Sequence, residues 1–201
     1  MSLARLLQLA SPTLPVGAYS YSQGLEAAIE AGQVTDEASA QAWIADVLEF
    51  AVLRMEAPVL WRMLHGEDLN ELFLASRETA ELRAETVQMG HSLARLIQDL
   101  DFGVVPLEEP SYPAAYAFIA RKFELKPEEA IQAYLWSWLE NQVMAAIKAV
   151  PLGQTAGQRM LLALGLLIEN FSMNEKMRNF APGLAFFSTR HETQYSRLFR
   201  S

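Results

Sequence analysis

The sequence contains no cysteine, which excludes disulfide bonds, thiolate metal sites and cysteine nucleophiles together. Its histidines, His65, His91 and His191, lie far apart, and none belongs to an HExxH motif or another paired metal-binding spacing. A metal site needs several converging ligands, so we interpret these histidines as ordinary surface or core residues. No metal-ligating residue is predicted in this chain.

Signatures of membrane insertion and secretion are also missing. No run of about eighteen uninterrupted apolar residues occurs, so no membrane span is expected. The nearest candidate, residues 130–147, contains Gln132, Glu140, Asn141 and Gln142. The first residues lack a basic region followed by an apolar run and a small-residue cleavage site, and we therefore expect no signal peptide.

Motifs of common enzyme classes are absent as well. The glycines near residues 16–18 and 153–154 lack both the spacing and the lysine of a nucleotide-binding loop. There is no GxSxG turn, and no aspartate-rich or Glu-x-x-His pair of the kind that helical bundles use for metal chemistry. We predict a protein that is not an enzyme, with no catalytic residue and no cofactor of its own.

Positive charge is scarce: the sequence contains 24 acidic and 16 basic residues, and its formal net charge is −8. Nucleic-acid binding requires a basic face, so this class of partner is not expected. The end of the chain differs from the body: from Ser188 onward Arg190, Arg197 and Arg200 outnumber the single acid, Glu192. A short basic tail on an acidic body either packs on its own body or binds another protein.

Strand-like alternation is nearly absent, whereas helical spacing of apolar residues dominates. A length of 201 residues with 51% hydrophobic content suits one domain with one core. We predict an all-α fold, a single-domain bundle of about eight to ten helices over residues 1–201, with residues 188–201 as a C-terminal tail.

Local signals predict where several helices begin and end. Residues 3–10 should form a short helix that stops at Ser11-Pro12. Ser20 with Gln23, and Thr155 with Gln158, have the spacing of a capping box and predict two helix starts. Pro113 and Pro127 should each open a helix, since proline is tolerated in a first turn.

Two longer helices follow from the same patterns. The helix that begins at Thr35 should be kinked or ended by Pro58. Apolar residues at alternating three- and four-residue steps predict one long helix over residues 68–100. Gly90 lies inside it, which we attribute to a neighbouring helix that approaches closely. The segment 130–147 is apolar on nearly every side and should be a central, surrounded helix.

Two segments carry candidate interaction residues. On the charged stretch 76–85, Arg77, Glu78, Glu81 and Arg83 form either a solvated face, a docking face, or a source of an arginine for the nucleotide site of a partner GTPase. The tail carries arginine, tyrosine and phenylalanine, and arginine and tyrosine are typical of interface hot spots. Composition alone leaves open whether the tail packs on its own bundle or contacts a partner.

Four segments together resemble the UreF family of urease accessory proteins. They are LLQLASPTLPVGAYSYSQGLEAAIEAG (6–32), ASRETAELRAETVQMGHSLARL (75–96), VPLGQTAGQRML (150–161) and RHETQYSRLFRS (190–201). The resemblance implies a cytoplasmic helical protein, a homodimer, that acts with UreD (UreH in some species), the GTPase UreG and the urease apoprotein in nickel insertion.

The resemblance also implies roles for particular residues. The tail would bind UreD, through Arg190, His191, Glu192, Gln194, Tyr195, Arg197, Phe199 and Arg200. A signature loop would comprise Pro12, Pro15, Gly17, Tyr19, Tyr21, Gln23 and Glu26. Its tyrosines and glutamine either face a partner or close over the bundle.

Three functional hypotheses follow. The first is a non-enzymatic adaptor, a component of a nickel metallochaperone complex, that positions UreD, UreG and apo-urease. The second is a regulator of UreG GTP hydrolysis. The third is a nickel carrier, which the lack of cysteine and the few histidines disfavour, because nickel prefers nitrogen and sulfur ligands. We expect the complex to handle nickel without tight binding by this chain.

Overall fold

The computed structural model describes residues 3–173 and 176–200, and every regular element in this part of the chain is helical. This confirms the all-α prediction and the expected number of helices. The α-helices in chain order are α1 (Leu3–Ala10), α2 (Leu25–Glu30), α3 (Glu37–Val47), α4 (Ala57–Leu64), α5 (Asn70–Ala75), α6 (Ala80–Asp99), α7 (Tyr112–Lys122), α8 (Pro127–Ala149), α9 (Gln154–Glu169) and α10 (Pro182–Glu192).

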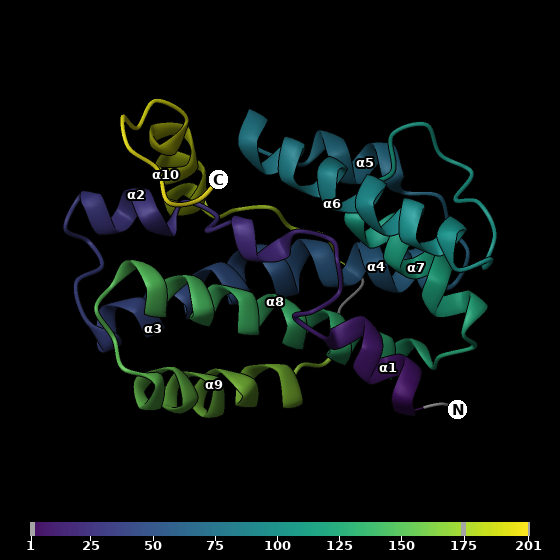
Figure 1. Cartoon of the computed structure of the whole chain (residues 1–201), viewed down its shortest axis with the longest axis horizontal. Helices are drawn as coiled ribbons and strands as arrows, with labels where there is room; N and C mark the ends of the chain where they lie inside the picture. Colours follow the sequence, from purple (N-terminus) through teal and green to yellow (C-terminus); the bar gives the residue numbers. More distant parts are fainter. Residues whose placement is uncertain (1–2, 174–175, 201) are drawn as a thin grey trace.

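Helix α8 lies in the middle of the bundle, as its apolar surface predicts (Figure 1). It packs against α1, α2, α3, α4 and α9. Leu135, Leu139 and Val143 are completely shielded from solvent in its central turns. Most positions of such a helix are buried, so a polar side chain on it needs a hydrogen-bond partner within the protein.

Pro58 does not end its helix. Helices α3 and α4 are joined without a break by a π-helical segment, Leu48–Glu56, which ends two residues before the proline. Proline lacks an N–H group and its ring collides with the carbonyl four residues earlier, that of Arg54. The wider π turn accommodates this, and the Arg54 carbonyl instead accepts a hydrogen bond of 2.8 Å from the backbone N–H of Arg178.

The predicted helix over residues 68–100 is wrong as one element, because α5 and α6 are separate. The side chain of Thr79 accepts a hydrogen bond from the N–H of Leu82 (3.1 Å) and caps a new helix start. Gly90 does mark a close approach, but the neighbour is the backbone of Pro110 and Ser111 ahead of α7 rather than a helix: a Cβ at Gly90 would lie 2.0 Å from the Pro110 oxygen.

Both predicted capping boxes are wrong, whereas Pro113 and Pro127 stand in the first turns of α7 and α8 as predicted. Residues Ala18–Ser20 form a short 3₁₀ turn, and α2 begins only after Gly24. Gln23, with φ of 51°, uses its side chain in a tertiary contact instead. Helix α9 begins after Gly153 with no side-chain cap, so Thr155 already lies inside it.

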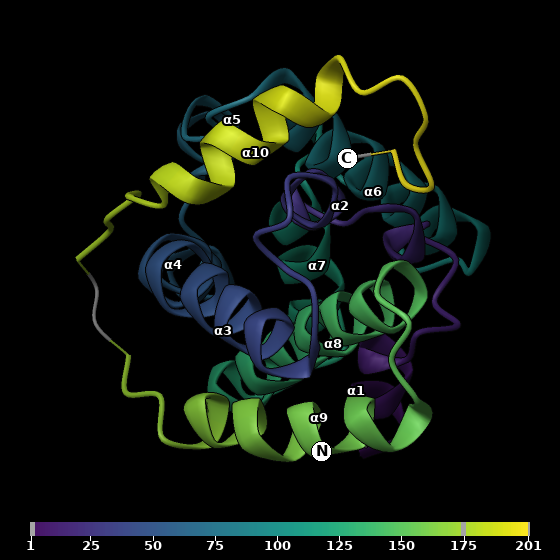
Figure 2. The same ribbon diagram turned by 90° about the vertical axis from the view of Figure 1, so that its left-hand side faces the viewer.

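The end of the chain closes the bundle (Figure 2). Residues 170–173 and 176–181 run along the outside from α9 to α10, and α10 packs on α2 and α6. The predicted tail therefore begins inside a helix, since residues 188–192 belong to α10, while Ser201 lies outside the described residues. Within the described residues, no helix is both long and apolar enough to cross a membrane.

Candidate functional site

Three segments that are distant in the sequence meet beside α10: the signature loop with the start of α2, the first turns of α6, and residues 190–200. Each was singled out by sequence as a separate candidate. Glu26 comes from the first segment, Glu81 from the second, and His191 with Arg197 from the third. We call these four residues the carboxylate latch.

The side chain of Glu26 binds backbone N–H groups of the C-terminal segment, residues 193–200. One carboxylate oxygen accepts the N–H of Leu198 at 2.6 Å, and the other accepts the N–H of Phe199 at 2.9 Å. Hydrogen bonds to an ionised acceptor are stronger than neutral ones. Binding of two successive N–H groups by one carboxylate fixes the direction of the chain at this point, after it has turned back from α10.

His191 lies between the two carboxylates and is completely shielded from solvent. Its Nδ1 is 2.9 Å from a carboxylate oxygen of Glu81, and its Nε2 is 3.2 Å from one of Glu26. Each ring nitrogen therefore lies within hydrogen-bonding distance of one carboxylate, and the imidazole bridges Glu26 and Glu81.

Glu81 completes the latch. Its second oxygen accepts a hydrogen bond of 2.8 Å from the guanidinium of Arg197, while its backbone N–H lies 3.4 Å from a carboxylate oxygen of Glu192. The N–H groups in the first turn of a helix have no partner within the helix, so an acid placed there is stabilising. Glu192, the last residue of α10, thus provides a carboxylate acceptor at the first turn of α6.

The predicted partner-contacting residues divide into two groups. His191 and Phe199 are buried against the body of this chain, and the Arg200 N–H donates to the Ser20 carbonyl at 2.8 Å. Tyr195 is fully exposed and the neighbouring Leu198 is 63% exposed. The remaining members, Arg190, Glu192, Gln194, Arg197 and Arg200, are exposed or half-buried around them.

The signature loop divides in the same way. Tyr21 and Gln23 are buried and close over the bundle, whereas Tyr19 is 66% exposed, with Pro12 and Pro15 exposed nearby. Gly17 has φ of 81°, a backbone conformation that favours glycine. Burial and the nearby charge of Glu85 raise the pKa of Tyr21, while a hydrogen bond with Arg200 and its charge act in the opposite direction.

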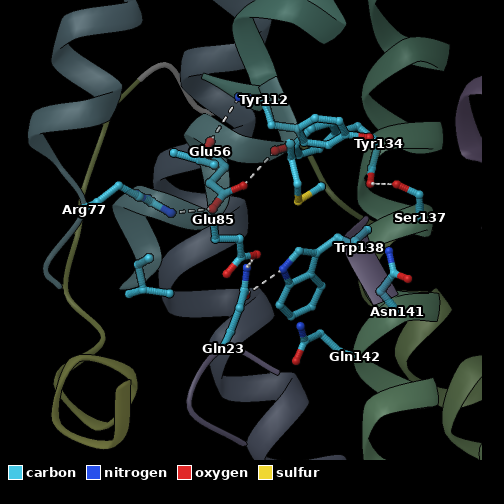
Figure 3. A pocket seen from close by; sticks show the side chains of 14 residues that line it. Gln23, Glu56, Arg77, Glu85, Tyr112, Tyr134, Ser137, Trp138, Asn141 and Gln142 are labelled. Atoms are coloured by element: carbon cyan, nitrogen blue, oxygen red, sulfur yellow. Dashed lines mark hydrogen bonds and ion pairs between the residues drawn. The ribbon is translucent and has the colours of Figure 1, made fainter. Parts of the chain in front are cut away.

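Beneath this loop lies a buried polar cluster around a cavity of about 50 Å³ (Figure 3). Gln23 joins two helices: its amide NH₂ donates to Glu85 at 2.7 Å, and its amide oxygen accepts the indole N–H of Trp138 at 2.9 Å. The position before Gly24 therefore bends the chain so that one side chain bridges α6 and α8. A cavity of this size has room for a few water molecules.

A second group on the same cavity is charged. Arg77 donates to Glu56 at 2.7 Å, and the other carboxylate oxygen of Glu56 accepts the hydroxyl of Tyr134 at 2.9 Å. Burial, then the charge of Glu56, raises the pKa of Tyr134 well above its ordinary value. Sequence reasoning missed Glu56, Glu85 and Trp138 as polar partners, because each is one residue in a helical pattern whose partners come from other helices.

The residues predicted to face a GTPase lie in different environments. Arg77 is buried with Glu56, and its guanidinium lies 4.4 Å from the centre of the Phe73 ring, so it is not available to another protein in this conformation. Glu81 belongs to the carboxylate latch. Arg83 is exposed and pairs with Glu109 through both guanidinium nitrogens, which lowers the pKa of Glu109. Glu78 is exposed.

Histidine, aspartate and glutamate do not gather into a candidate metal site: in the part of the chain that the structure describes, no group of three or more such residues could hold an ion. His65 contacts its own helix through the carbonyl of Trp61 at 2.7 Å. Fold and site together define an all-helical protein whose buried polar groups connect its two ends and fix the conformation of its last residues.

The family follows from comparison with known proteins. A family model described as UreF matches residues 34–165. The urease accessory protein UreF of Azoarcus sp. (strain BH72) is 55% identical over 100% of this chain and 96% of its own length. That of Dechloromonas aromatica (strain RCB) is 51% identical over 100% of this chain and 98% of its own. This chain belongs to the UreF family of urease accessory proteins.

A third relative has a different architecture. The bifunctional urease accessory protein UreEF of Bordetella bronchiseptica is 50% identical over 99% of this chain, which covers 52% of that longer protein. The family is one of accessory proteins, and membership gives this chain a role in urease maturation, the process that inserts nickel into urease.

Proposed function

We propose that this chain acts as a non-enzymatic, cytoplasmic adaptor that holds UreD (UreH), the GTPase UreG and the urease apoprotein together during nickel-dependent maturation. One observation carries the proposal: the carboxylate latch binds the C-terminal residues to the body of the chain, while the side chains of Tyr195 and Leu198 are exposed to solvent. Tyrosine is among the residues that contribute most at protein interfaces.

A fixed segment suits this role for an energetic reason. A flexible tail loses conformational freedom when it binds, and that loss subtracts from the affinity. Here backbone groups of Leu198, Phe199 and Arg200 are already hydrogen-bonded to the body, and the Phe199 side chain is buried. A partner that binds the exposed side chains of Tyr195 and Leu198 therefore causes a smaller loss of conformational entropy.

In keeping with the resemblance to UreF proteins, we propose UreD as the partner of this surface. The UreEF protein of Bordetella bronchiseptica supports the idea that a UreF-type unit works beside other accessory proteins, since one chain combines two of them. UreG and apo-urease would occupy other faces of the same assembly.

Co-purification with UreD tests the proposal. Deletion of residues 190–201 should abolish binding, but it also removes the buried His191 and Phe199. A sharper test is Tyr195→Ala with Leu198→Ala, which leaves every backbone contact in place and should weaken binding at least tenfold. Val104→Ala, 66% exposed on the loop between α6 and α7, is the matched control. Undiminished binding by the tail variant would remove this surface from the UreD interface.

The homodimer is part of the same proposal. On α9, Leu162 is 76% exposed and Leu166 is 54% exposed one turn further on, and Trp136 of α8 lies beside Gly165. An apolar face of this kind marks an interaction surface more often than an isolated exposed leucine does. Leu162→Glu should shift the mass in solution towards the monomer, measured by light scattering, whereas Val104→Glu should not.

Nickel would be handled by the assembled complex, without tight binding by this chain alone. Equilibrium dialysis of the isolated protein against nickel tests this directly. Stoichiometric binding at micromolar nickel would contradict it and would favour the carrier hypothesis.

Regulation of UreG is the second candidate function, and the exposure of Arg83 favours keeping it. An arginine supplied to a GTPase raises its turnover by orders of magnitude. Steady-state GTP hydrolysis by UreG, with and without this protein, separates a regulator from an adaptor.

A further inference from the structure

We propose that Glu26 and Glu81 are positioning residues for the UreD-binding surface, and that they act together through His191, which bridges them. The inference rests on the proposed function for the identity of the partner. The latch itself is a property of this chain alone and can be tested without any partner.

The first step of the argument is connectivity. Glu26 contacts both ends of the exposed segment: His191 at the end of α10, and the backbone N–H groups of Leu198 and Phe199 where the chain returns to the body. Glu81 likewise contacts His191 and Arg197. The residues between these anchor points include the fully exposed Tyr195. The two carboxylates therefore determine where the Tyr195 side chain lies.

The second step is charge. The groups that face the His191 ring are Glu26 from α2 and Glu81 from α6; Arg197 pairs with Glu81, and Glu192 lies beside the first turn of α6. Two largely buried carboxylates therefore converge on the buried imidazole, and one of them also pairs with the partly exposed guanidinium of Arg197.

The third step is separation from the core. The latch lies beside α10, whereas α8 lies in the middle of the bundle and contributes none of the four latch residues (Figure 1). Opening the latch would release Phe199 and the preceding residues without removing the contacts of α8. A change in the latch should therefore alter the C-terminal segment while the helical body stays folded.

Amide hydrogen exchange of Leu198 and Phe199 in the full-length protein tests the latch. Both amides should be protected in the unmodified chain, and Glu26→Gln should lower their protection about tenfold or more, because a charged acceptor is lost. Glu37→Gln is the matched control, since Glu37 also pairs with an arginine but lies on α3. Circular dichroism and thermal unfolding establish that each variant is folded.

The variant His191→Gln tests the role of the histidine. The imidazole contacts one carboxylate with each ring nitrogen, and a glutamine side chain in its place should not keep both contacts, so protection of Leu198 and Phe199 should fall. Unprotected amides in the unmodified chain, or unchanged protection in His191→Gln, would overturn the latch.

Affinity for UreD then tests positioning, and it separates failure of this inference from failure of the proposed function. We expect Glu26→Gln to bind UreD about tenfold more weakly. Lowered protection with unchanged affinity would overturn the positioning role. Unchanged affinity of the Tyr195→Ala, Leu198→Ala variant would instead refute the proposed surface, whatever the exchange data show.

Discussion

The guanidinium of Arg77 and the carboxylate of Glu56 form an ion pair of 2.7 Å in which both side chains are almost completely buried. The pair connects the segment between α5 and α6 to the end of the π-helical stretch, and Tyr134 of α8 donates to the same carboxylate. The arginine that sequence offered as a candidate for a GTPase site thus stabilises the interior of its own chain.

Replacement of Arg77 should therefore act on stability. Arg77→Met leaves the carboxylate of Glu56 buried without its cation, which typically costs about 3–5 kcal/mol of unfolding free energy. The double variant Arg77→Met, Glu56→Met removes both charges and should be more stable than Arg77→Met alone. Urea unfolding of the unmodified protein, Arg77→Met, Glu56→Met and the double variant measures both effects, and additive losses would contradict a coupled pair.

Gly90 should not tolerate a side chain. A Cβ there would lie 2.0 Å from the backbone oxygen of Pro110, and backbone cannot move aside as a flexible side chain can. We expect Gly90→Ala to destabilise the protein by about 3 kcal/mol or more. Gly183→Ala, in the first turn of α10 with no atom near its Cβ position, is the control and should be neutral or slightly stabilising.

Alkaline pH should unfold this protein through its buried tyrosines. Burial raises the pKa of Tyr112, Tyr116 and Tyr134, while in the unfolded chain tyrosine ionises near pH 10. The folded state therefore binds more protons above about pH 10, and stability present at neutral pH is lost as the pH rises further.

Tyr116→Phe tests this sign. At neutral pH it loses the hydrogen bond to the carbonyl of Ala130 and should cost about 1 kcal/mol. Towards about pH 11 the difference from the unmodified protein should shrink, because one ionising group has been removed. Tyr195→Phe, fully exposed, should show no such trend. Urea unfolding at both pH values is the measurement.

Arg83 distinguishes an adaptor from an arginine-supplying activator. If this protein acts only as an adaptor, Arg83→Ala should change UreG turnover in the complex by less than about tenfold, against the thousandfold or larger loss expected for a catalytic arginine. Arg95→Ala, on the same helix and paired with Asp99, is the matched control. A loss of activation confined to Arg83→Ala would favour the regulator.

Much of the helical framework could be predicted locally. Residues 3–10 form a helix with the expected limits, and Pro113 and Pro127 open theirs. The failures have a common cause. The break before α6 depends on Thr79, whose hydroxyl also contacts Ser188 from α10. Pro58 is accommodated because the carbonyl of Arg54 accepts a hydrogen bond from the N–H of Arg178. These partners lie far along the chain and are not visible in a local pattern.

The candidate site was predicted in parts. Sequence singled out Glu26, Glu81 and His191 in three unrelated segments, each with a different suggested role. Nothing in those segments indicates that the three side chains touch, since the contact between Glu26 and His191 spans 165 positions. The composition of the tail left two interpretations open, and the resemblance to UreF proteins favoured a partner contact. In the structure individual tail residues differ, since His191 is buried and Tyr195 is exposed.

What the sequence alone determined is the all-helical class, several helix starts and the acidic body with a basic end, because propensity, proline and charge act over a few neighbouring residues. Only the tertiary structure decided which polar side chains are buried together, that Arg77 faces inward, and that the last residues are fastened by Glu26 and Glu81. Burial and hydrogen bonding depend on where distant helices pack, and that packing is a property of the whole chain.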